Sequence, residues 1–153
     1  RGPKDGFFLR AESFFNVATN IEQLDAEPGL GPPIIDSFGG RSLHEQSHGE
    51  SFLTLLTKRF RKEGLYILDE PEAALSPTRQ MAALRSIHEL VKDASQFIIA
   101  THSPILMAYP DARILLIEEG DIRTVAYTET EHFAVAKSFL NNHQKMLADL
   151  LSE

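Results

Sequence analysis

The 153-residue sequence contains no cysteine, so neither disulfide bonds nor a thiolate zinc site can stabilise its fold. No apolar run approaches the ~20 residues that a membrane-spanning helix needs, and the first residues lack the apolar core of a signal peptide. Basic residues are also few, since 15 lysines and arginines stand against 22 acidic residues, for a formal net charge of −7. This excess of acidic residues does not favour a protein that binds nucleic acid over its whole surface, although nucleic acid remains open as a partner. These absences predict a cytoplasmic protein.

What is present has the size and composition of one ordinary domain. Hydrophobic residues make up 42% and charged residues 24% of the chain, near the norm for globular proteins and enough for a hydrophobic core. Apolar runs at 65–68 and 96–101 predict two strands, and an amphipathic segment at 77–93 predicts a helix between them. Because both strands are apolar throughout, this order predicts a parallel sheet that is covered on both faces.

Further elements are predicted on either side of this unit. A short strand is expected at 6–10 and helices within 11–24 and at 51–61. The stretch 25–40 is rich in proline and glycine and predicts a loop. Near the end, two strands are expected to meet in a hairpin at Gly120–Asp121. A helix should follow over 131–151, and Asn141 and Asn142 are candidates to break it.

Two adjacent carboxylates, Asp69 and Glu70, follow the first apolar strand in "LYILDEPEAALSP". A strand that ends in a polar turn would explain them without any function. The alternative is that the two carboxylates have different roles in catalysis. One would hold a hydrated Mg²⁺ that bridges phosphates, and the other would orient or deprotonate an attacking water. In open parallel sheets the ligand-binding and catalytic residues usually lie at the carboxyl ends of the strands, which is where these two residues are expected.

His102 comes directly after the second apolar strand, in "FIIATHSPIL". A lone histidine is more often structural than catalytic. Here, however, one helix and one strand separate it from the acidic pair, which would bring the two strand ends side by side. A histidine at that place could hydrogen-bond a terminal phosphate. Ser103 and Pro104 predict the cap and first turn of a short helix.

A third segment, "LHEQSHGESFLTLL", leads into the helix predicted at 51–61. Ser47 followed by Gly49 could offer a hydroxyl and free backbone N–H groups, which is how helix N-termini bind phosphate. Ser47 and Glu50 also have the spacing of an ordinary capping box. Taken alone, this segment is explained by the cap at least as well as by a phosphate site.

In this order, "SHGES", "LYILDEPEAALSP" and "FIIATHSP" resemble the second half of an ABC-type ATPase. The likeness is greatest to predicted ATPases that are not transporters and are related to the chromosome-maintenance and recombination branch. It covers about 42–120 and implies an α/β fold, the parallel-sheet core of a P-loop NTPase with flanking helices and a C-terminal hairpin. The chain would then be one partial domain with a variable region (1–41), a motif-bearing region (42–127) and a helical tail (128–153).

The resemblance implies a role for each motif. Ser47, His48, Gly49 and Glu50 would form the signature motif, although the family usually has glycine where His48 stands. Ser76 would lie in the D-loop. In this family two domains, as in a homodimer, pack head to tail and sandwich ATP between them, so these residues would close over the nucleotide of the partner.

The chemistry implied is Mg²⁺-dependent hydrolysis of ATP. Asp69 would be the Walker B aspartate that acts on Mg²⁺ through water. Glu70 would be the catalytic glutamate that polarises the attacking water, and His102 the switch histidine at the γ-phosphate. The expected cofactors are therefore ATP and Mg²⁺.

One part of the family pattern is missing from this sequence. The P-loop motif G-x-x-x-x-G-K-[ST] does not occur, because no glycine is followed by Lys-Ser or Lys-Thr. The nearest imitation, Gly40-Arg41-Ser42, has Ile35 where the first glycine should be. We therefore expect a fragment of a longer ATPase that is inactive by itself. Two alternatives are a non-catalytic interaction module derived from such an ATPase and the ATPase part of an overcoming-lysogenization-type nuclease.

Overall fold

The computed structural model describes residues 2–10, 25, 33, 36, 48–118 and 120–152. It divides into two compact units, Arg1–Thr101 and His102–Glu153, which are described separately. The helix predicted within 11–24, nearly all of the loop predicted at 25–40, and Ser47 lie outside the described residues.

The first unit is built on a parallel sheet with the strand order β1-β2-β3. The strands are β1 (Asp5–Arg10), β2 (Gly64–Asp69) and β3 (Gln96–Ala100). The three strands predicted in this part of the sequence are thus confirmed, as is the parallel α/β class. Their register places Asp69 between Arg10 of β1 and Ala100 of β3, at the carboxyl edge of the sheet.

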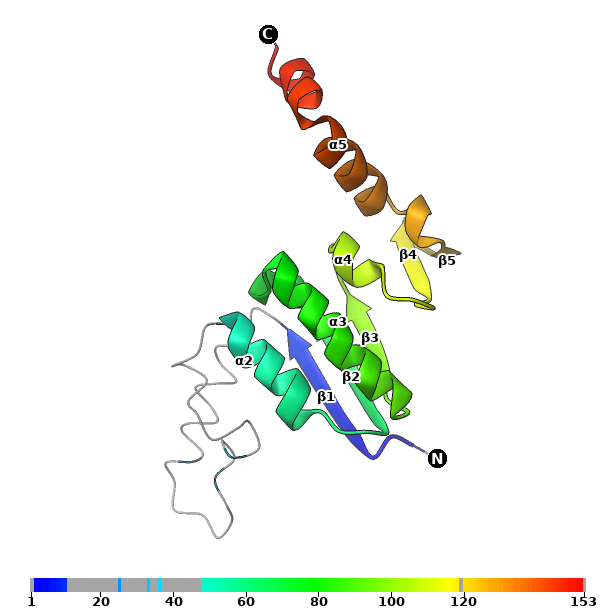
Figure 1. Cartoon of the computed structure of the whole chain (residues 1–153). Helices are drawn as coiled ribbons and strands as arrows, with labels where there is room; N and C mark the ends of the chain where they lie inside the picture. Colours follow the sequence, from blue (N-terminus) through cyan, green and yellow to red (C-terminus); the bar gives the residue numbers. More distant parts are fainter. Residues whose placement is uncertain are drawn as a thin grey trace. The chain divides into compact units, whose positions relative to one another are not determined.

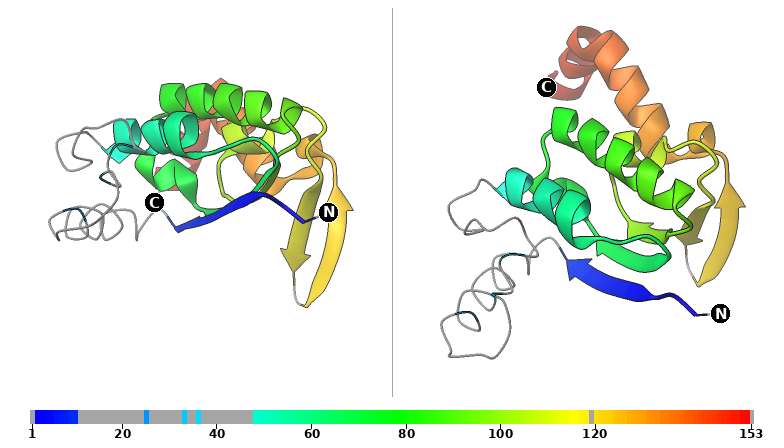
Figure 2. Two further views of the ribbon diagram at one scale, coloured as in Figure 1. Left: turned by 90° about the horizontal axis from the view of Figure 1, so that it is seen from below. Right: turned by 60° about the horizontal axis from the view of Figure 1, so that its bottom comes forward.

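Two helical segments pack on one face of this sheet, as Figures 1 and 2 show. One begins as α2 (His48–Thr54) and continues as the π-helix η3 (Leu55–Arg59). The other is α3 (Pro77–Lys92), close to its predicted bounds. The prediction of one regular helix at 51–61 was wrong in its last turn, where the Phe60 N–H donates to the Leu55 carbonyl at 3.2 Å. Sequence periodicity does not reveal such a wide turn.

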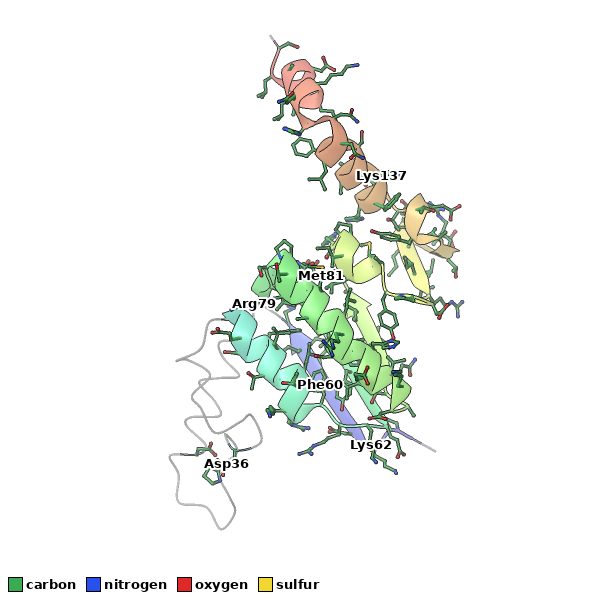
Figure 3. The ribbon with its side chains drawn as sticks, in the orientation of Figure 1. Asp36, Phe60, Lys62, Arg79, Met81 and Lys137 are labelled. Atoms are coloured by element: carbon green, nitrogen blue, oxygen red, sulfur yellow. The ribbon has the colours of Figure 1, made fainter. Side chains whose placement is uncertain are left out.

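The core of the first unit lies between these helices and the sheet. Phe60, labelled in Figure 3, stacks on Tyr66 with ring centroids 3.9 Å apart, and Phe97 lies 5.2 Å from Tyr66. The fully buried side chains of this layer alternate along β2 with exposed ones. The buried members of the layer are Leu9, Phe52, Leu55, Leu56, Phe60, Tyr66, Leu68, Ala83 and Ile87.

The opposite face of the sheet carries exposed apolar side chains. Phe8, Ile67 and Ile98 are neighbours across the three strands and are 64%, 36% and 52% exposed. The prediction that both faces are covered is therefore not met by the described residues, in which α2 and α3 lie on the same side. Apolar composition identifies the two faces of a strand as apolar but does not identify the segments that cover them.

The second unit contains a hairpin and a long helix. It comprises α4 (Pro104–Met107), β4 (Ile114–Glu118), β5 (Asp121–Val125), η5 (Tyr127–Glu129) and α5 (Glu131–Leu151). The predicted hairpin is confirmed, with β4 and β5 antiparallel and Gly120 at a φ of 88°. The predicted helix is confirmed as well, and its predicted break falls at Asn142, where φ and ψ leave the helical region.

Candidate functional site

The carboxyl edge of the sheet is the centre of the candidate site. Tyr66 and Leu68 of β2 face the helices, so Asp69 at the end of the strand projects from the opposite face, called the open face here because α2 and α3 leave it uncovered. There Arg10 Nε donates to Asp69 Oδ2 at 2.8 Å. The side chain of Asp69 remains 29% exposed, so water and ions have access to a carboxylate that is already held in place. Arg10 was not identified from the sequence, because its role depends on strand register.

Glu70 has a strained backbone directly after the strand. Its φ of 49° and ψ of 50° lie in the left-handed region, where non-glycine residues carry a cost of about 1–3 kcal/mol. A hydrogen bond from its N–H to the Ala100 carbonyl, at 2.9 Å, ties this turn to β3. The neighbouring structure thus maintains an exposed carboxylate in a fixed, unfavourable turn, which is a pattern found at functional sites.

The turn after Glu70 is fixed from two sides. It forms the short 3₁₀-helix η4 (Pro71–Ala74). Thr101 Oγ1 donates to Glu72 Oε2 at 2.7 Å and so attaches η4 to the end of β3. Farther along, the Gln80 amide donates to the Leu75 carbonyl at 3.0 Å, and this contact is buried. Sequence reasoning assigned no role to Glu72 or Thr101, because their contact joins positions 29 residues apart.

Ser76 begins α3 as its N-cap. Its hydroxyl accepts from the Arg79 N–H at 3.4 Å, and Pro77 occupies the first helical turn. The structure thus gives Ser76, predicted to lie in a nucleotide-contacting D-loop, a capping role. A nucleotide contact by the same hydroxyl stays a prediction.

Gly49, from the segment predicted as the signature motif, lies against Ala74 and Arg79, which flank the predicted D-loop residue Ser76. His48 begins α2, and Gly49 is buried. A Cβ placed on Gly49 would lie 2.9 Å from the Ala74 carbonyl oxygen and 2.6 Å from Arg79 Nη1, so only glycine fits here without a shift of neighbouring atoms. Figure 3 shows Arg79 beside this end of α2. Glu50, predicted to bind nucleotide, pairs with Arg79 Nη2 at 3.3 Å.

His102 is the first residue of the second unit and is separated from the end of β3 by Thr101. Its Nδ1 lies 3.1 Å from Nε2 of His132, which sequence reasoning did not single out. The predicted cap beside it is confirmed, because the Ser103 hydroxyl accepts from the N–H groups of Ile105 and Leu106 at 3.1 and 3.2 Å. This cap fixes the chain immediately after His102.

The residues present fit a magnesium ion that arrives with a nucleotide. Among the described residues no three or more His, Cys, Asp or Glu side chains gather into a metal-binding group. Mg²⁺ needs no such cage, because it keeps several waters and usually takes one or two carboxylates together with substrate phosphates. Asp69 is a carboxylate of this kind.

Comparison with known proteins gives the chemistry a context. Residues 39–108 match the family described as "AAA domain, putative AbiEii toxin, Type IV TA system". An uncharacterized ABC transporter ATP-binding protein of Haemophilus influenzae is 32% identical over 80 residues, which are 52% of this chain and 30% of that protein. A putative ABC transporter ATP-binding protein of Methanothermobacter marburgensis is 38% identical over 61 residues, 40% of this chain and 22% of that protein. No solved structure matched the chain.

These matches support an ATPase family of the ABC/AAA kind. They bear out the general resemblance inferred from the three motifs, and the family match contains Asp69, Glu70 and His102. The chain spans less than a third of the length of either curated relative. In the described part of the chain, no helix has the length and apolar content needed to cross a membrane.

Proposed function

We propose that this chain supplies part of the active site of an ATPase that binds and hydrolyses ATP. The observation that carries the proposal is the carboxyl edge of the sheet, where an anchored Asp69 is followed by a strained, exposed Glu70. The similarity to ABC transporter ATP-binding proteins supports the choice of ATP as the nucleotide.

In the proposed reaction Asp69 would hold Mg²⁺, while Arg10 keeps one of its carboxylate oxygens in place. When bound with ATP, Mg²⁺ neutralises charge that develops on the phosphates. Glu70 orients the attacking water and accepts its proton. The left-handed turn gives Glu70 a backbone direction that continuation of the strand would not allow.

His102 donates a hydrogen bond to the γ-phosphate in this proposal. The support for this role is the chain order, because Thr101, the residue before His102, follows β3 at the edge where β2 ends in Asp69. The implied second ATPase domain completes the site, as its signature motif faces the nucleotide. On the present chain that motif is Ser47, His48, Gly49 and Glu50, and it acts on the partner's ATP.

Replacement of the proposed base tests this function. Glu70→Gln in the intact protein removes the proton acceptor but keeps the size of the side chain, and the expected loss in the rate of ATP hydrolysis is about 10²–10⁴-fold. ATP should still bind, so bound ATP and a dimer should accumulate. Glu89→Gln is the matched control, since Glu89 is an exposed residue of α3 that pairs with Lys92. Parent-like hydrolysis by Glu70→Gln would refute the assignment.

A binding experiment separates the enzyme from a non-catalytic interaction module. The 153-residue chain and a version extended upstream are compared for Mg²⁺-dependent ATP binding. Binding that appears only in the longer version supports the ATPase. If neither version binds ATP, the interaction module becomes the better explanation.

A further inference from the structure

The contact between His102 and His132 joins residues 30 positions apart. Nδ1 of His102 and Nε2 of His132 are 3.1 Å apart, and the two rings are inclined by 37°. A neutral imidazole has one N–H donor and one acceptor nitrogen. Only one of the two facing nitrogens can therefore carry the shared hydrogen, and which one does decides where the second ring proton of the pair lies.

His132 is held firmly in the first turn of α5. Thr130 caps this helix, accepts from the Phe133 N–H at 3.3 Å and is 3% exposed. Tyr127 packs edge-on against Phe133 and donates from its hydroxyl to the Pro104 carbonyl at 2.8 Å. These contacts attach the start of α5 to the segment that follows His102, so the two histidines meet between two fixed pieces of backbone.

The two hydrogen-bond directions have opposite consequences. If His102 donates from Nδ1, its Nε2 is an acceptor and cannot bond a phosphate oxygen, which also accepts. If His132 donates, the proton of His102 lies on Nε2, and this nitrogen can donate to phosphate. Only the second direction is compatible with the role proposed above for His102.

We propose that His132 is a positioning residue that donates from Nε2 to Nδ1 of His102 and thereby keeps the proton of His102 on Nε2. This inference rests on the proposed function, because the need for an Nε2 donor comes from the phosphate contact. The device is of the same kind as a hydrogen-bond partner that fixes the tautomer of a metal-binding or catalytic histidine.

Two nearly isosteric substitutions test the direction of the bond. In His132→Gln the side-chain amide can still donate to His102 Nδ1, whereas in His132→Glu the ionised carboxylate can only accept. Imidazole ¹⁵N shifts of the 153-residue chain report the tautomer of His102 directly. We expect the Nε2–H form in the parent and in His132→Gln, and the Nδ1–H form in His132→Glu. His143→Glu, farther along α5, should leave His102 unchanged.

Two results would overturn the proposal. One is an Nδ1–H tautomer of His102 in the parent, and the other is a His102 tautomer that does not respond to His132→Glu. Far-UV circular dichroism of the 153-residue chain checks that each variant is folded. His132→Phe, which can neither donate nor accept, is a further comparison, and a mixture of His102 tautomers is expected in it.

Hydrolysis by the intact protein separates this inference from the proposed function. His132→Glu should lower kcat by about 10–100-fold, as loss of an orienting partner typically does, and His132→Gln should stay near the parent. Suppose that the tautomer responds as expected but neither His132→Glu nor His102→Ala changes the rate of hydrolysis. This result would refute the contact of His102 with phosphate and still support the hydrogen bond between the two histidines. Slower hydrolysis without a change of tautomer would refute the positioning role.

Discussion

The two faces of the three-stranded sheet differ in what their side chains do. On the helix-covered face Tyr66 and Leu68 are at most 1% exposed, and the ring of Tyr66 stacks on Phe60. On the open face Ile67 and Ile98 are 36% and 52% exposed, and the charged pair Arg10 and Asp69 lies at the carboxyl end of the same face. Stability is therefore concentrated on one face, while the groups proposed for chemistry project from the other or lie at its end.

The largest effect expected from this difference is on stability. Leu68→Ala opens a cavity in the covered layer and should lower the free energy of unfolding by about 2–5 kcal/mol. Ile98→Ala on the open face should cost about 1 kcal/mol or less, because much of its side chain is already in water. Urea denaturation measures both. Equal losses of unfolding free energy in the two variants would show that the open face is covered in solution and that the two faces do not differ as described.

Gly49→Ala tests the close packing at the start of α2. The added methyl group meets the Ala74 carbonyl oxygen, which belongs to backbone and cannot swing away, so a cost of about 1–3 kcal/mol is expected in the same denaturation assay. Gly2→Ala is the control, since its Cβ would meet nothing within 4 Å. If the two variants are equally stable, the contact between α2 and η4 is looser than described.

Glu70→Gly separates strain from chemistry at the carboxyl edge. Glycine adopts the left-handed turn without the Cβ penalty, so the variant should gain up to about 1 kcal/mol of stability while it loses hydrolysis. Glu63→Gly, at a φ of 58°, should gain similarly and keep the parent rate. A destabilised Glu70→Gly would mean that the carboxylate itself stabilises the turn.

Tyr66 gives the covered face a pH dependence. Burial, with a further contribution from the nearby Asp5 carboxylate, raises the pKa of the Tyr66 phenol above its ordinary value, although a hydrogen bond with the backbone of Arg61 opposes this. The unfolded chain therefore loses this proton first, and stability should fall as the pH rises above about 10. Tyr66→Phe should lack this part of the alkaline decline in urea titrations. An identical decline in both proteins would assign it to other groups.

Most of the secondary structure follows from local sequence. The strands at 65–68 and 96–101 were predictable because each is centred on an unbroken apolar run. The helix α3 was predictable because Ser76 and Pro77 mark its start and an apolar stripe runs through it. The break in α5 occurs at Asn142, one of the two asparagines predicted to interrupt this helix. The π-helical turn after Thr54 was not predictable, because i→i+5 bonding leaves no period in a sequence this short.

The candidate site was predictable only in its acids and in His102. Asp69 and Glu70 stand out because charge follows an apolar run abruptly. Their partners do not, since Arg10 reaches Asp69 across 59 residues, Thr101 reaches Glu72 across 29, and His132 reaches His102 across 30. Such pairs are created by strand register and helix docking, which one sequence does not specify.

The most direct test of the account is to map where the nucleotide-borne metal lies. Fe²⁺ replaces Mg²⁺ with ATP in the intact protein, and hydroxyl radicals generated at the metal then cleave the nearby backbone. We expect cleavage at 69–70 and 100–102 that needs ATP and disappears in Asp69→Asn. ATP-dependent cleavage in the hairpin at 118–121, with none at 69–70 or 100–102, would contradict a phosphate and metal site at the carboxyl edge of this sheet.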